Sequence, residues 1–258
     1  MLIGAMNHPA KPLEEEIEWM VRLGLDFIDL TLEPPAVAAW QVKAQEVKDR
    51  LEQAGLGVVG HTAYYLPIGS SFESLRRAAI DELKRCIEKF ATIGARWVNV
   101  HPDGHAPFVE EPRVIARNVD SLRELAAFAR GAGLGVMVEN VPGRFNSAPQ
   151  LAAVLDPLPD LGLHLDIGHC NLGVEHNTTE AVLARFAPRL AHVHLHDNRG
   201  GTADLHLALG MGNMDVRRYV QALKRSGYDG TITLEVFSAD PHYLEHSRDR
   251  LKAWWSEA

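Results

Sequence analysis

The sequence GVMVENV at residues 135–141, followed by LGLHLDIGH at residues 161–169, decides the fold class of this chain. Each stretch is a short apolar run that ends in side chains able to bind a metal: Glu139 in the first, and Asp166 with His169 in the second. A buried carboxylate at a strand end needs a partner, because an unpaired charge away from water is costly. A helix-like stretch separates the two runs, and strands that alternate with helices favour a parallel sheet.

The same pattern recurs along the whole chain. Further strand-like runs lie at 2–6, 27–33, 56–63, 96–101, 190–197 and 231–237. Helix-like stretches follow from Leu13, at 37–53, 74–93, 111–130 and 148–158, from Thr178, after Asp215 and at 241–256. Strand–helix units of about 30 residues predict an α/β protein with a (β/α)8 TIM barrel. The length of 258 residues suits one such barrel and no linker divides it, so we expect a single domain over 1–258.

The composition excludes several other classes of protein. A formal net charge of −8 disfavours a general polyanion-binding surface, although a local basic groove stays open. Cys86 and Cys170 make no disulfide framework, and a buried thiol is favoured over a metal ligand at Cys170. We see no signal peptide and no run near the roughly 20 apolar residues of a membrane span, so we expect a cytoplasmic protein without membrane partners.

The strand ends carry side chains that could hold a metal. They are Asn7, Glu33, His61, His101, Glu139, Asp166 with His169, His194 with His196, and Glu235. In a barrel these ends meet at one face, so the side chains should converge there. Carboxylates and imidazoles suit zinc, manganese and other divalent ions. No strand interior supplies an arginine to pair with the carboxylates, since Arg96 starts a strand at the opposite rim.

Two segments near the end of the seventh run add further candidates. His192, His194 and His196 alternate along one strand and face one side, but steps of about 6.5–7 Å prevent all three from binding one ion. One should be a ligand and another should support it or lie at the rim. Asp197 could orient a ligand imidazole or pair with Arg199.

The segment DLHLALGMG at 204–212 places Asp204 and His206 on one side of an extended backbone. The glycines that follow, Gly210 and Gly212, could leave amide groups free to cradle an anion. The lysines all fall in helical stretches or their approaches, which disfavours a Schiff-base aldolase.

These motifs resemble those of the xylose-isomerase-like TIM barrel superfamily over essentially the whole chain. Its isomerases and epimerases hold one divalent ion through Glu, Asp, His and Glu. The resemblance implies four ligands: Glu139 in VENVPG, Asp166 in LDIGH, His194 in HVHLHDN and Glu235 in TLEVF. His194 is chosen among the three histidines because the family pattern has a histidine three residues before an acid, here Asp197.

The leading hypothesis is therefore a divalent-metal isomerase or epimerase acting on a sugar, a cyclitol or a sugar phosphate through an enediolate. The metal would be Zn, Mn, Co or Mg, with one to three ions. Glu139 and Glu235 would also be the acid–base groups, and His169 would orient a substrate oxygen or hold a second ion. Residues expected to bind the carbohydrate are His61, His101 and Arg199.

The alternative is a zinc-dependent apurinic-site endonuclease of the endonuclease four type, which hydrolyses a phosphodiester at a two- or three-metal cluster. The resemblance to that branch implies additional ligands: His61, His101, His169, Asp204 and His206. The rim loops offer few arginines, mainly Arg144 and Arg199, which ranks this function second and disfavours nucleic acid as a partner without excluding it. A metal-dependent binding barrel without turnover is a third hypothesis, and a homo-oligomer stays open.

Overall fold

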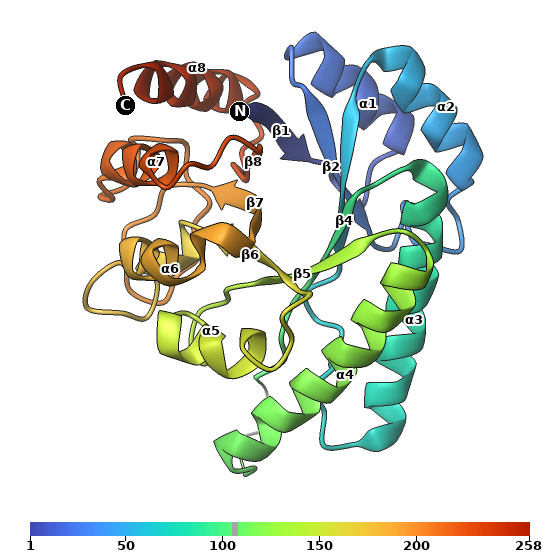
Figure 1. Ribbon diagram of the computed structural model, residues 1–258. Coiled ribbons are helices and arrows are strands. Elements are labelled where there is room, and N and C mark those ends of the chain that lie inside the picture. Colours follow the sequence, from blue (N-terminus) through green and yellow to red (C-terminus); the bar gives the residue numbers. More distant parts are fainter. Residues whose placement is uncertain (105–107) are drawn as a thin grey trace.

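The computed structural model describes residues 1–104 and 108–258. Eight parallel strands close into a barrel in sequence order, and the helices surround it (Figure 1). The strands are β1 (Leu2–Met6), β2 (Phe27–Leu32), β3 (Gly57–Thr62), β4 (Trp97–Val100), β5 (Gly135–Glu139), β6 (Gly162–Asp166), β7 (Leu190–Leu195) and β8 (Thr231–Leu234). The predicted (β/α)8 TIM barrel is confirmed.

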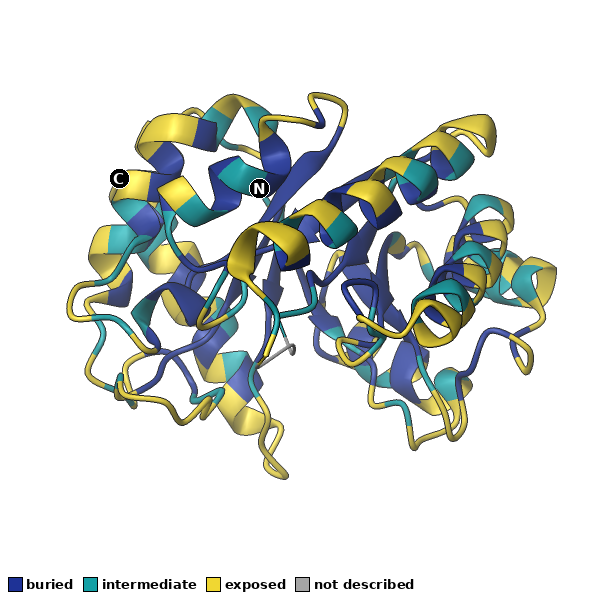
Figure 2. Ribbon diagram, turned by 90° about the horizontal axis from the view of Figure 1, so that it is seen from below, coloured by how far each residue is buried: buried dark blue, intermediate teal, exposed yellow. Residues whose placement is uncertain are grey.

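The helices follow the strands in alternation. They are α1 (Leu13–Arg22), α2 (Ala44–Ala54), α3 (Glu73–Ile93), α4 (Glu111–Gly131), α5 (Ala148–Leu155), α6 (Thr179–Phe186), α7 (Val216–Arg225) and α8 (His242–Ser256). The strands are buried, while each helix turns one face to the barrel and exposes the other (Figure 2). None of the helices in the described residues has the length and hydrophobicity needed to span a bilayer.

Alternation along the strands separates two kinds of interior. In β2, Ile28 and Leu30 join the large apolar core that the helices cover. Phe27 faces the other way and, with Val59 and Met137, forms a small apolar cluster of its own. Because neighbouring residues of a strand point to opposite sides, that cluster lies inside the barrel near the strand starts. Polar side chains occupy the interior from there to the strand ends.

One helix begins later than the sequence pattern predicts. The stretch from residue 37 was expected to be helical, but α2 begins only at Ala44. Val37, Ala38 and Ala39 are all buried and lie in an irregular segment that follows the turn at Pro35. Three successive buried residues do not fit a surface helix, which buries one stripe only.

The close approach of β1 to β2 depends on a glycine. Gly4 pairs with Phe27 of β2 and with Thr233 of β8, so it lies where the barrel closes. A Cβ atom at Gly4 would lie 2.6 Å from both the ring and the carbonyl oxygen of Phe27. Neither can yield without moving the strand.

We expect Gly4→Ala to lower the free energy of unfolding by about 1–3 kcal/mol, the usual cost of overpacking. Gly131→Ala is the matched control, because a Cβ there meets nothing within 4 Å, and it should be neutral or stabilising by up to about 1 kcal/mol. Denaturant unfolding measures both. Equal stability of the two variants would contradict this packing.

Candidate metal centre

The four residues expected to bind one ion lie together at the carboxyl ends of the strands. Glu139 and Asp166 are the last residues of β5 and β6, His194 lies near the end of β7, and Glu235 follows β8. Ligand atoms of the first three lie within 4.8 Å of one another. The Oε2 atom of Glu235 lies 3.1 Å from Nδ1 of His194. These four side chains are called the central cluster below.

Two histidines flank the central cluster on the side of β3 and β4. The Nε2 atom of His101 lies 2.9 Å from Oε2 of Glu139, and Nε2 of His61 lies 3.8 Å from the same oxygen. Asn99 donates a hydrogen bond of 2.7 Å to that oxygen and so fixes the carboxylate. His61, His101 and Glu139 could therefore share an ion.

A second flank comes from the loop after β7. The Oδ2 atom of Asp204 lies 3.1 Å from Nε2 of His169 and 3.0 Å from Nε2 of His206. His206 holds a positive φ of 45°, which is uncommon for any residue other than glycine. Its carbonyl accepts the Phe237 N–H at 3.1 Å, which ties this strained residue to the end of β8.

His196 joins this flank as an additional donor. It is fully buried, with Nε2 3.4 Å from Oδ1 of Asp166 and 3.6 Å from Oδ1 of Asp204. The sequence left open whether it supports a ligand or lies at the rim. Its position among carboxylates makes it a candidate ligand as well.

The electrostatics of the central cluster call for a cation. Burial acts to raise the pKa of Glu139, but the imidazoles of His164 and His101 outweigh it and hold that pKa well below its ordinary value. Burial acts to lower the pKa of His194, but the Glu235 charge and a hydrogen bond to Asp29 raise it well above its ordinary value. Positive charge beside these carboxylates is therefore stabilising, and either a proton or a metal ion at Nδ1 of His194 can supply it.

Several polar atoms in and beside the central cluster lack a hydrogen-bond partner in the protein. Within the described residues, Oδ2 of Asp166, Nδ1 of His101 and Nε2 of His196 are buried without a hydrogen bond. No lysine or arginine of the described ranges pairs with Glu139 or Glu235, whose ion pairs are all with histidines. A buried carboxylate needs a positive charge nearby, and a divalent ion bound by these carboxylates and imidazoles would supply it.

Other expected residues do not enter the cluster. Asn7 binds the backbone of Thr31 at 2.7 Å, and Glu33 hydrogen bonds Tyr65, whose pKa rises to about 12 through burial and that contact. The eight strand ends therefore do not all converge. Arg199 is exposed and makes no ion pair within the described residues.

The interpretations of Asp197 and of the glycine segment were wrong. Asp197 neither orients a ligand imidazole nor pairs with Arg199, because its carboxylate accepts backbone N–H groups. These are the amides of Gly210 at 2.9 Å, Gly212 at 3.0 Å and Met214 at 3.3 Å. The amides are therefore already engaged and cannot cradle an anion. Asp197 instead folds the loop that carries Asp204 and His206.

Two buried residues were missed by sequence reasoning. Asp29 lies in the middle of β2, and His164, to which the sequence assigned no role, lies in β6; both are fully buried. Alternation along the strand could have indicated Asp29, because it lies on the same side of β2 as Thr31.

Cys170 is buried, and burial raises the pKa of its thiol to about 11. Cys170 is not among the groups of side chains in the described residues that could hold a metal.

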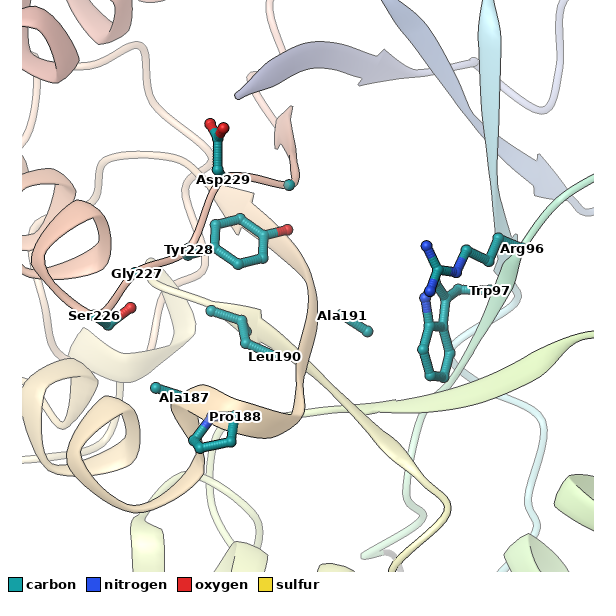
Figure 3. Close-up of a pocket in the computed structure, with 11 residues that line it drawn as sticks. Arg96, Trp97, Ala187, Pro188, Leu190, Ala191, Ser226, Gly227, Tyr228 and Asp229 are labelled. Carbon is teal, nitrogen blue, oxygen red and sulfur yellow. The ribbon is translucent and has the colours of Figure 1, made fainter.

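Two exposed aromatic side chains lie beside histidines of the flanks. Phe237 stacks on His206 with ring centroids 4.3 Å apart, and exposed Tyr64 lies 6.4 Å from the ring of His101. A separate pocket lies at the other end of the barrel, lined by residues at strand starts such as Arg96, Trp97 and Leu190 (Figure 3). Within its lining Asp229 is the only acid, so this pocket is not the metal centre.

A family model described as xylose isomerase-like TIM barrel matches residues 17–254. The chain belongs to this family. One protein with a similar sequence is the fructoselysine 3-epimerase of Shigella flexneri, 25% identical over 96% of this chain and 95% of that protein. An uncharacterised protein of Methanocaldococcus jannaschii is 30% identical over 74% of this chain and 67% of its own length. The fold is similar to that of a D-tagatose 3-epimerase-like protein, with a TM-score of 0.87 and 22% identity over 100% of this chain and 98% of that one.

Binding of a divalent ion should stabilise the fold. After treatment with chelator, Mn²⁺, Co²⁺ or Zn²⁺ at about 100 times its Kd should add about 2.7 kcal/mol, a rise in Tm of roughly 5–10 °C. Asp166→Asn should reduce this shift, because it removes a charge from the central cluster. An unchanged Tm with every one of these ions would contradict the assignment.

Proposed function

We propose that this protein is a divalent-metal-dependent isomerase or epimerase of a sugar, a cyclitol or a sugar phosphate. The observation that carries the proposal is the union of Glu139 and Glu235 with Asp166 and His194 in one buried cluster. The match to a fructoselysine 3-epimerase over nearly the whole chain supports the same class of reaction, with a small carbohydrate as the substrate.

In this proposal the two glutamates move the proton. Glu139 approaches the cluster from β5 and Glu235 from β8, on different sides of His194. One carboxylate takes the proton from the carbon beside the substrate carbonyl, and the other returns a proton from the opposite face. An ion bound by the cluster would supply positive charge against the negative charge of the enediolate.

The surrounding histidines support binding in different ways. Nδ1 of His169 lies 2.9 Å from the carbonyl oxygen of Asn140, so a proton on Nδ1 leaves Nε2 free to act as a ligand. We assign that nitrogen to a second ion, shared with Asp204 and His206. His61 and His101 remain the candidates for contact with the substrate or for a further ion.

The donor set narrows the choice of ion. Imidazole nitrogens together with carboxylate oxygens suit Zn²⁺, Mn²⁺ or Co²⁺ better than Mg²⁺, which prefers oxygen ligands and keeps several waters. Arg199 is proposed to contact a substrate phosphate. Tyr64 and Phe237 are suited to pack on the apolar faces of a sugar ring.

The roles of the two carboxylates can be measured directly. Glu139→Gln and Glu235→Gln should each lower kcat by about 10²–10⁴-fold, the range for loss of a general acid or base. The assay uses 2-ketoses, their phosphates, cyclitols and fructoselysine, and metal content is measured in each variant. Glu46→Gln on exposed α2 is the control and should keep full activity. Full activity in both active-site variants would reject the acid–base assignment.

Solvent exchange separates the enediolate route from a hydride shift. Turnover in deuterium oxide should place one deuterium at the epimerised carbon, because the glutamate that returns the proton is a different one and carries a deuteron from the solvent. Mass spectrometry and proton NMR of the product give the result. A product without deuterium after full conversion counts against the enediolate.

The number of metal donors favours a second candidate, phosphodiester hydrolysis at a two- or three-metal cluster. The flanks could each hold a further ion together with one carboxylate of the central cluster: His61 and His101 with Glu139, and His169 and His196 with Asp166. A zinc-loaded protein that incises an abasic-site duplex, and loses this in Glu235→Gln, would support it. Absence of incision with the metals bound would reject phosphodiester hydrolysis, and the isomerase or epimerase would be the remaining proposal.

A further inference from the structure

The floor beneath the central cluster is built around a buried carboxylate. Asp29 of β2 is fully buried and reaches across the barrel to β7 and β8. Its Oδ2 atom lies 2.7 Å from Nε2 of His194, 3.2 Å from Nε2 of His192 and 2.9 Å from the hydroxyl of Thr233. Three polar groups from two other strands thus converge on one oxygen atom.

The contact with Asp29 determines which nitrogen of His194 carries the proton. An ionised carboxylate only accepts hydrogen bonds, so Nε2 of His194 must donate. A neutral imidazole with its proton on Nε2 presents a lone pair at Nδ1. That Nδ1 lies 3.1 Å from Glu235 and 4.0 Å from Asp166, so the lone pair faces the central cluster.

The rest of the floor keeps Asp29 in place. His192 is itself held, because its Nδ1 lies 2.7 Å from the hydroxyl of Thr231 while Nε2 lies beside Asp29. His164, His192 and His194 also lie close enough to suggest a separate buried ion. Both ring nitrogens of His164 are buried without a hydrogen bond. Both nitrogens of His192 are engaged, however, so His192 has no free lone pair to offer such an ion.

We propose that Asp29 is a positioning residue, which fixes the tautomer and ring orientation of His194 so that Nδ1 can bind the divalent ion. The inference rests on the proposed metal-dependent function. Carboxylates that hold the far nitrogen of a metal-ligating histidine typically contribute 10–100-fold to metal affinity. A residue of β2 thereby orients a metal ligand on β7 through a hydrogen bond.

The first test measures metal affinity by chelator competition, without turnover. Asp29→Ala should weaken binding of Co²⁺ or Zn²⁺ by about 10–100-fold. Asp29→Asn should lose less, because its amide oxygen still accepts from Nε2. Ser121→Ala is the control: Ser121 is also buried and hydrogen bonded, but between α3 and α4. It should lower Tm and leave the affinity unchanged.

The second test needs no substitution at Asp29. Nitrogen-15 NMR of the zinc-loaded protein, with the signal assigned by its loss in His194→Gln, should show a proton on Nε2 of His194. A proton on Nδ1, or none on either nitrogen, would overturn the inference, as would wild-type affinity in Asp29→Ala. A wild-type protein that binds no divalent ion would contradict both the proposed function and the role of Asp29. A wild type that binds the ion, with unchanged affinity in Asp29→Ala, would contradict the role of Asp29 alone.

Discussion

The site depends on the interaction between carboxylates that folding removes from water and the groups that can offset their negative charge. Glu139, Asp166 and Glu235 lie at the carboxyl ends of the strands, and histidines are their only ionisable partners of opposite sign within the described residues. Carboxylates in that setting repel one another and lose hydration, and a cation between them would offset both effects. A protonated imidazole supplies part of that charge, and the proposed divalent ion would supply more.

The barrel interior is arranged to meet this need. Near the strand starts, Phe27, Val59 and Met137 form a dry apolar cluster. Asp29 and its hydrogen-bond donors come next, and the central cluster lies above them. Polarity therefore increases toward the carboxyl ends of the strands. The apolar end secures the barrel, while the polar end is left free to bind and react, as is usual in this fold.

Much of this arrangement follows from the sequence. Glu139 and Asp166 stand at the ends of apolar runs, and a barrel brings such strand ends to one face. The contact of Asp29 with His194 was not predictable in the same way, since it depends on the tilt and stagger of the strands. The role of Asp197 was missed because a side chain that binds backbone amides leaves no pattern of its own. The start of α2 was missed because Val37, Ala38 and Ala39 resemble a helical stretch.

The site has more metal-ligating side chains than one ion needs, so it is compatible with two proposed reactions, isomerisation or epimerisation and phosphodiester hydrolysis. A single ion in the central cluster suits proton transfer beside a carbonyl, whereas further ions on the flanks suit attack on phosphorus. The loop that carries Asp204 and His206 governs one flank, and Asp197 holds that loop closed. The net charge of −8 disfavours a general polyanion-binding surface, and Arg199 is exposed without an ion pair in the described residues.

The most direct measurement is anomalous diffraction from crystals of the protein loaded with Mn²⁺ or Co²⁺. We predict a strong anomalous peak within coordination distance of Glu139, Asp166, His194 and Glu235, with any weaker peaks on the flanks formed by His101 or Asp204. Density that contains no anomalous peak among these four side chains, in crystals that bind the metal elsewhere, would contradict the central claim.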